Sequence, residues 1–196
     1  MSKRKAKKPP PTRKASESAA QLREALARRK KAELVDVLLE LAQADRGVLR
    51  QLTARFNVVA APAELVVATR QAIADATAFD ERDINRNFDY DDEAYQEVKR
   101  NLGRLITSGH LPQAMQLALE LMKQGSYQVE MSDEGMMADD IKACLNEVLK
   151  ALPKCELPAA DVIAWCSAML DNDRVGFIAR EPLQSLRKQF QAIPAR

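Results

Sequence analysis

Apolar side chains recur every three or four residues along almost the whole chain from about residue 31 onward. Leu34, Leu38 and Leu41 share one face of such a helix, and the same spacing returns in each later segment up to Phe190. No segment shows the sustained alternation of apolar and polar residues that is typical of a half-buried strand. The sequence therefore predicts an all-α fold.

The predicted helices come in pairs. Residues 95–122 show a helix, a turn at Ser108 and Gly109, and a second helix in which Ala114 and Ala118 are small enough for a close helix crossing. No sequence repeat of constant length accompanies these pairs. We expect about eight or nine helices in antiparallel pairs, stacked as a short solenoid-like array similar to tetratricopeptide repeats.

The helix predicted over residues 111–123 is apolar on two faces. One face holds Ala114, Ala118 and Leu121, and the other holds Met115, Leu119 and Met122. A helix with two apolar faces is sandwiched between neighbours, so we expect it to be the most buried helix. Leu117 lies off both faces, and we expect it to tolerate truncation to alanine better than Leu121 does.

Charge is segregated along the chain. Residues 1–31 carry twelve basic and two acidic side chains, a balance of +10, whereas the whole chain has a formal net charge of +2, which leaves −8 for the rest. Residues 1–14 contain no acidic or aromatic residue, so they cannot bury enough apolar surface to offset the entropy of ordering. We predict a disordered basic arm over residues 1–15 and one helical domain over residues 16–196, with Ser16 or Ser18 capping its first helix.

The basic arm suggests a non-specific electrostatic tether to nucleic acid. Its basic residues are Lys3, Arg4, Lys5, Lys7, Lys8, Arg13 and Lys14. Basic side chains that neutralise phosphates release counterions and need no contact with the bases, and the arm lacks the aromatic rings that stack on bases. The alternative is that the arm only aids solubility.

A polar, irregular segment, residues 79–92, is long for a connection between helices. Aromatic and acidic residues alternate at its end, in the run Phe88, Asp89, Tyr90, Asp91, Asp92 and Glu93. One interpretation is that the two rings fill a gap between helix pairs. The other is an acidic, aromatic recognition edge for a basic protein partner. The carboxylates also suit the first turn of a helix, as do Asp133 and Glu134 after Ser132.

Residues that carry catalysis or bind metals are scarce. His110 is the only histidine and has no neighbouring nucleophile or orienting carboxylate in the sequence. Cys144, Cys155 and Cys166 form no Cys-x-x-Cys pair and are separated by prolines, so we expect buried thiols. We therefore expect no enzyme activity, no cofactor and no metal site.

A membrane span requires an apolar run of about 18 residues, and no run in the chain approaches this length. We also expect no signal peptide at its start. Three cysteines without a disulfide pattern favour a reducing compartment. The sequence predicts a cytoplasmic protein without a membrane span.

Several short motifs resemble one known domain. They are Leu38-Leu39 with Ala42 and Asp45, Asn87-Phe88-Asp89-Tyr90-Asp91-Asp92, Leu102-x-x-Leu-Ile-x-x-Gly-His110, Ala114-x-x-Leu-Ala-x-x-Leu-Met122 and Ser132-Asp-Glu-Gly135. On these motifs, residues 34–190 resemble an uncharacterised all-helical domain that follows SWIM-type zinc fingers in bacteria. The resemblance implies a helical fold, and it implies no zinc or DNA role because the Cys-x-Cys and Cys-x-His of the finger are absent.

The function that we expect is a non-catalytic helical scaffold that mediates protein–protein interaction, with residues 79–92 at the edge of its binding groove. The alternative is a nucleic-acid-associated protein that is tethered through the basic arm.

Overall fold

The structure is a computed structural model that describes residues 13–56, 61–86 and 90–192. Every regular element in these residues is a helix, which confirms the all-α prediction. The chain divides into two compact units, Met1–Val58 and Val59–Arg196. This division differs from the single domain predicted over residues 16–196, and each unit is described by itself.

The described part of the first unit contains α1 (Arg13–Ala27), α2 (Lys31–Ala44) and α3 (Arg46–Arg55). Helix α2 packs against α3. Asp45 joins them and caps α3, because its carboxylate accepts hydrogen bonds from the backbone N–H groups of Gly47 at 2.7 Å and Val48 at 3.2 Å.

The start of α1 corrects the predicted boundary of the basic arm. Arg13 and Lys14 belong to the helix, so neither Ser16 nor Ser18 caps it. Arginine, lysine and alanine are good helix formers, and the helix therefore extends to the N-terminal side of the serines. Residues 1–12 of the predicted arm, with Lys3, Arg4, Lys5, Lys7 and Lys8, lie outside the described residues.

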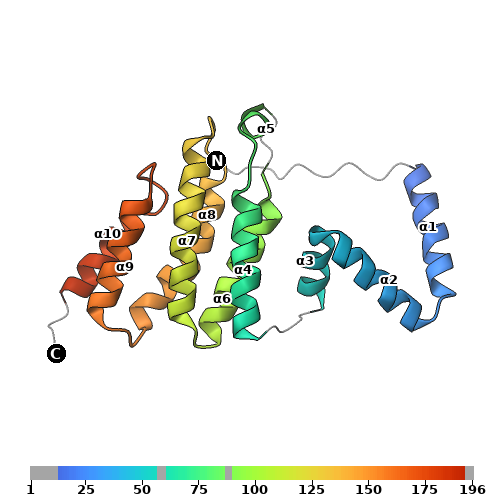
Figure 1. Ribbon diagram of the computed structural model, residues 1–196, viewed down its shortest axis with the longest axis horizontal. Helices are drawn as coiled ribbons and strands as arrows, with labels where there is room; N and C mark the ends of the chain where they lie inside the picture. The colour runs from blue at the N-terminus through green and yellow to red at the C-terminus, as the bar shows by residue number, and fades with distance from the viewer. Residues whose placement is uncertain (1–12, 57–60, 87–89, 193–196) are drawn as a thin grey trace. The chain divides into compact units, whose positions relative to one another are not determined.

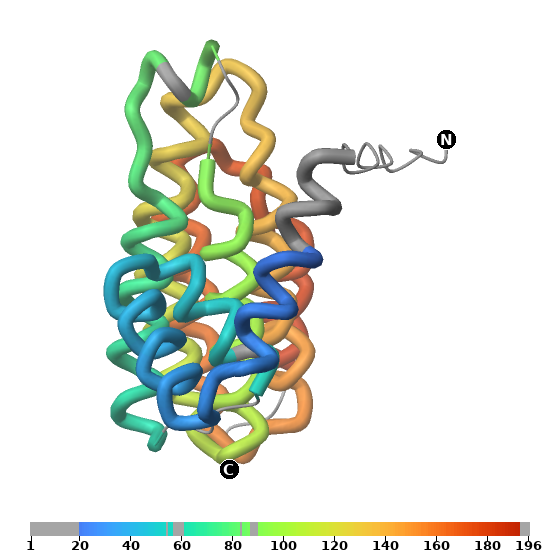
Figure 2. The backbone as a smooth tube through the Cα atoms, turned by 90° about the vertical axis from the view of Figure 1, so that its right-hand side faces the viewer, coloured from blue at the N-terminus to red at the C-terminus, as the bar shows by residue number. Residues whose placement is uncertain are grey.

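The second unit is built from antiparallel helix pairs. Its helices are α4 (Pro62–Thr77), α5 (Glu81–Arg86), α6 (Asp92–Thr107), α7 (Leu111–Glu130), α8 (Ala138–Ala151), the short 3-10 helix η1 (Leu152–Lys154), α9 (Ala159–Asn172) and α10 (Arg180–Gln191). Helices α4, α7 and α9 lie side by side in one layer, and α6, α8 and α10 form a second layer behind them (Figure 1). Figure 2 turns the view by 90° and shows that the long helices of this unit run roughly parallel or antiparallel to one another.

Because successive long helices run in opposite directions, the connections that precede α6, α8 and α10 lie at the same end of the unit (Figure 1). We call this end the loop end. Two hydrogen bonds join its first two connections: the side chain of Asn85 donates to the backbone oxygen of Met131 at 3.2 Å and accepts from the backbone N–H of Asp133 at 2.9 Å. The segment 79–92, which was predicted to be irregular, is partly helical because it contains α5. Through Asn85 it also contacts the connection between α7 and α8.

Helix α7 is the centre of the second unit, because it packs against α4, α6, α8 and α9. It buries more residues than any other described helix, as predicted for residues 111–123. Leu117 lies off both predicted faces but is only 1% exposed, which removes the reason to expect that it tolerates truncation better than Leu121 does. The exposed residues of α7 are confined to one narrow stripe that includes Gln113, Gln116 and Lys123, so two apolar faces understate its burial.

Helix α7 also continues past the predicted end at Lys123 to Glu130. Gly125 and Ser126 do not end it. Both are buried, and the missing side chain of Gly125 lets α8 approach, because a Cβ atom built there would lie 2.7 Å from Ile141 Cδ1. The small residues therefore serve packing between helices rather than a turn.

Local signals place the other helix ends. Pro62 lies in the first turn of α4, where proline is favoured. Gly109 follows α6 with a φ of +82°, at the turn that the sequence predicts. The expected start of a helix at Ser132 is wrong, since α8 begins at Ala138 and its acidic first turn is Asp139 and Asp140. Gly135, whose φ is +58°, holds a left-handed turn that keeps the helix from starting earlier.

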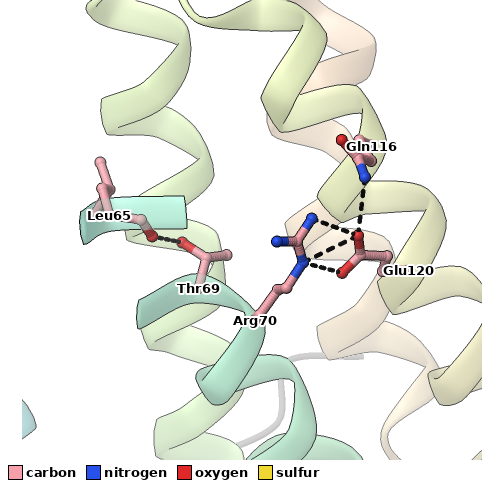
Figure 3. Close-up of polar contacts among 5 residues, drawn as sticks. All are labelled: Leu65, Thr69, Arg70, Gln116 and Glu120. Atoms are coloured by element: carbon pink, nitrogen blue, oxygen red, sulfur yellow. Dashed lines mark hydrogen bonds and ion pairs between the residues drawn. The ribbon is translucent and has the colours of Figure 1, made fainter. Parts of the chain in front are cut away.

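An exposed ion pair joins α4 to α7 within the first layer (Figure 3). Arg70 Nε lies 2.9 Å from Glu120 Oε2, and Nη2 lies 3.0 Å from Oε1. The hydrogen bonds that Arg70 donates to Glu120, together with the negative charge of Glu120, raise the pKa of Arg70 above its ordinary value. Pairs of this kind add little stability when exposed, but the two-nitrogen geometry orients the helices.

Among the described residues, none of the helices is both long and apolar enough to span a membrane.

Candidate functional site

Tyr90 anchors the end of segment 79–92 to the core. Its hydroxyl donates a hydrogen bond to Asp140 Oδ2 at 2.9 Å, and its ring meets Tyr95 edge to face with centroids 6.1 Å apart. Burial, followed by this hydrogen bond and the charges of Asp140, Asp92 and Asp139, raises the pKa of Tyr90. Tyr90 therefore keeps its proton and fills a gap between α6 and α8, which agrees with the first of the two interpretations for this side chain.

Below Tyr90, a chain of buried hydrogen bonds connects three helices. The hydroxyl of Tyr95 on α6 donates to Gln128 Oε1 on α7 at 2.5 Å, and Gln128 Nε2 donates to the backbone oxygen of Ala76 on α4 at 3.1 Å. Tyr95 and Gln128 are fully buried. Burial raises the pKa of Tyr95, so its hydroxyl stays a donor. These polar groups support the loop end from inside the core.

The three acidic residues after Tyr90 begin α6. Asp91 caps the helix, because its carboxylate accepts from the backbone N–H of Ala94 at 2.9 Å. Asp92 and Glu93 lie exposed in the first turn, where the helix dipole favours negative charge. The predicted role of these carboxylates at a helix start is confirmed, and it leaves two of them at the surface.

A shallow depression of about 510 Å³ opens at this helix start. It is lined by Ala78, Phe79, Asp80, Tyr90, Asp91, Asp92 and Glu93. Four of these residues are carboxylates, two are aromatic and none is basic. We call it the acidic depression. It brings together four of the six residues predicted as a partner-binding edge, and the other two, Phe88 and Asp89, lie outside the described residues.

A second depression of about 520 Å³ lies on the other side of Phe79 and is lined by Thr77, Phe79, Lys123, Gln124, Tyr127 and Arg174. The rings of Phe79 and Tyr127 are 5.9 Å apart between centroids. The guanidinium carbon of Arg174 lies 5.0 Å from the Tyr127 centroid, and its Nε lies 2.5 Å from Glu130 Oε2. We call this the basic depression.

Sequence reasoning missed the basic depression. Its residues come from the end of α4, from α7 and from the connection after α9, which are far apart along the chain. Only Tyr127 offers a signal, since it is an aromatic residue on a long helix that lies off the predicted apolar stripes. The arrangement follows from the stacking of the helix pairs.

His110 lies at the opposite end of the second unit, in the turn between α6 and α7. Its Nδ1 lies 3.3 Å from Ser108 Oγ. Among the residues that the structure describes, no group of three or more His, Cys, Asp or Glu side chains is placed to hold a metal ion.

The three cysteines are free thiols, and they differ in burial. Cys144 and Cys166 are buried and Cys155 is half-buried. Burial raises the pKa of Cys144 to about 12 and that of Cys166 to about 11. Cys144 Sγ also donates to the backbone oxygen of Tyr95 at 3.2 Å. The two buried thiols are therefore protonated in the folded protein at neutral pH.

We expect Cys155 alone to react rapidly with a thiol reagent in the native protein, because the reagent needs an accessible thiolate. Titration with Ellman's reagent should detect one fast thiol under native conditions and all three in denaturant. The variant Cys155→Ser should lose the fast phase. Fast reaction of Cys144 would show that the core around α6 and α8 opens readily, and fast reaction of Cys166 would show the same for the core around α9.

Comparisons with protein-family models, with curated proteins and with solved structures found no match.

Proposed function

We propose that this protein is a non-catalytic helical scaffold that binds a basic segment of a protein partner in the acidic depression. The observation that carries the proposal is the lining of that depression, which places four carboxylates and two aromatic rings around one hollow without a basic side chain among them.

The chemistry of the depression fits arginine and lysine side chains. A guanidinium can lie on an aromatic ring while its N–H groups reach a carboxylate. Phe79 and Tyr90 provide the rings, and Asp92 and Glu93 provide exposed carboxylates beside them. The Tyr90 ring is already held by its hydrogen bond to Asp140, so little conformational entropy is lost when a partner binds.

The arrangement of the helices supports the same proposal. The antiparallel pairs α4/α6, α7/α8 and α9/α10 stack in two layers, which is how solenoid-like interaction domains similar to tetratricopeptide repeats are built. Such a stack presents the connections within its pairs at one edge, and the acidic depression is formed at the first of them, between α4 and α6. We also propose that residues 34–190 are related to the helical domain that follows SWIM-type zinc fingers in bacteria.

The test uses fluorescent dodecapeptides that combine arginine or lysine with leucine at varied spacing, with binding measured by anisotropy. The double variant Asp92→Asn/Glu93→Gln should weaken the best peptide about tenfold or more, because a hydrogen bond to a charged group contributes about 1.5–3 kcal/mol. The matched control is Glu156→Gln/Asp161→Asn, which removes the same charge from exposed residues near the start of α9, at the opposite end of the unit. Equal losses in both variants would mean that net charge alone attracts the peptide and would overturn the proposal.

A second candidate function is non-specific attachment to nucleic acid through the first unit. Its residues 1–58 carry 15 basic and 6 acidic side chains, and Arg28, Arg29 and Lys30 between α1 and α2 are exposed together with Lys31 at the start of α2. Retention on duplex DNA should fall steeply with salt, and deletion of residues 1–12 should reduce the slope. The acidic-depression variant should leave this retention unchanged, which separates the two candidates.

A further inference from the structure

The ring of Phe79 separates the acidic depression from the basic depression, because it lines both of them. Phe79 is half-buried and packs against the core, so its ring stays between the two hollows. Both depressions belong to the second unit. An extended chain advances by about 3.3 Å per residue, so neighbouring side chains of one short segment bound across Phe79 can enter both.

The basic depression offers positive charge that no carboxylate in its lining neutralises. Its charged lining residues are Lys123 and Arg174. Lys123 is exposed on α7 and makes no hydrogen bond or ion pair with another residue that the structure describes. Arg174 donates from Nε to Glu130 Oε2 at 2.5 Å, while its two Nη groups have no hydrogen-bond partner among the described residues. A carboxylate in this depression would therefore meet an ammonium group and guanidinium N–H groups that are still available.

Neighbouring charges leave this difference between the depressions intact. Glu120 lies one turn before Lys123 on α7, but its carboxylate is paired with Arg70, whose Nε lies 2.9 Å from Glu120 Oε2. Neither depression is lined by the exposed charged residues of α5, which are Glu81, Arg82 and Arg86. The surface is therefore negative on one side of Phe79 and positive on the other.

The guanidinium of Arg174 is held in place before a partner binds. Its carbon lies 5.0 Å from the centroid of Tyr127, and Glu130, which accepts its hydrogen bond, lies three residues after Tyr127 on α7. The rings of Tyr127 and Phe79 are 5.9 Å apart between centroids and continue this row of contacts to the edge of the acidic depression. Because the group is already ordered, a carboxylate binds it with little loss of conformational entropy.

We propose that the partner segment carries an acidic side chain near its basic one, and that this acidic side chain binds Lys123 and Arg174 in the basic depression. The inference rests on the proposed function, since the basic side chain of the same segment occupies the acidic depression. The two depressions together then select a segment of mixed charge. A purely basic segment would place a second positive charge beside Lys123, and like charges that face each other across an interface exclude wrong partners.

The test starts from the arginine or lysine dodecapeptide that binds the acidic depression most tightly. Each of its other positions is changed in turn to glutamate and to glutamine, and binding to the full chain is measured by anisotropy. At the position that faces the basic depression, we expect glutamate to bind about fivefold more tightly than glutamine, the upper range for an exposed ion pair. The sign is decisive, because added negative charge would weaken binding to a surface that recognises positive charge alone.

Variants of Lys123 assign the effect to the basic depression. Lys123→Gln should remove the preference for glutamate, and Lys123→Glu should prefer lysine over glutamate at the same peptide position. The matched control is Lys150→Gln, which removes the same charge from an exposed lysine in the last turn of α8, at the end of the unit opposite the loop end. It should keep the preference. Circular dichroism should show the same helix content in all three variants, because both lysines are exposed.

The results distinguish this inference from the proposed function. If binding depends on Asp92 and Glu93 but glutamate never binds more tightly than glutamine, the acidic depression recognises its partner alone and the inference is overturned. A preference for glutamate that survives in Lys123→Gln overturns it as well. If binding does not depend on Asp92 and Glu93, the proposed function fails and this inference fails with it.

Discussion

Truncation of Leu121 to alanine is expected to lower the free energy of unfolding of the second unit by about 2–5 kcal/mol, and truncation of Leu117 is expected to cost nearly as much. Both side chains lie on α7, and their exposed fractions are 0% and 1%. Because α7 is packed against four other helices, its surroundings cannot collapse into the cavity that either variant leaves. The loss of apolar burial and the cost of the cavity therefore add.

Urea denaturation followed by tryptophan fluorescence measures this effect. Trp165 is the only tryptophan, and its Nε1 donates to the backbone oxygen of Met115 on α7 at 2.8 Å, so its emission reports on the second unit. Val67→Ala is the control, since this valine is 67% exposed and its truncation should change stability by less than about 0.5 kcal/mol. A Leu117→Ala variant as stable as the wild type would mean that α7 faces its neighbours as the sequence alone predicts.

The second large effect is a difference in sign between two glycine-to-alanine substitutions. Gly125→Ala is expected to destabilise the protein by about 1–3 kcal/mol through overpacking, whereas Gly103→Ala is expected to stabilise it by up to about 1 kcal/mol. At Gly125 a new Cβ would lie 2.7 Å from Ile141 Cδ1 and 3.1 Å from its Cγ1, and Ile141 is fully buried. At Gly103 the nearest atom is Glu147 Oε2 at 3.7 Å, an ordinary contact.

Each variant is the control for the other, because the gain in helix propensity is the same and only the space differs. Thermal melts of the two proteins, recorded under the same conditions, give the comparison directly. If Gly125→Ala were as stable as Gly103→Ala, α8 would have to move away from α7 at no cost, and the close approach of the two helices would not contribute to the core.

Most helix positions follow from local sequence. Pro62, the Asp91 cap and Gly109 each act within a few residues, so the start of α4 and both ends of α6 are predicted well. The wrong predictions of helix ends come from packing between helices that are far apart along the chain. Gly125 and Ser126 are typical of a helix end, yet they lie inside α7, because what decides their place is the neighbouring α8 and not their own propensity.

The same difference between local sequence and long-range packing separates the two depressions. The acidic depression takes most of its residues from one continuous segment, so the run of aromatic and acidic residues was visible in the sequence. The basic depression unites Phe79, Tyr127 and Arg174 from three distant segments, and no local pattern could bring them together. The choice for Tyr90 between a core contact and a surface role also needed the position of Asp140 on another helix.

The buried hydrogen bonds from Tyr95 to Gln128 and from Gln128 to Ala76 have a consequence for the alignment of the helices. Aliphatic seams between helices tolerate small sliding movements, since one methyl group replaces another as a neighbour. A slide of one residue moves a helix by about 1.5 Å, which would break a hydrogen bond of ordinary length and leave a buried polar group unpaired. Helices α4, α6 and α7 therefore share a single permitted register, and the depth of both depressions at the loop end depends on it.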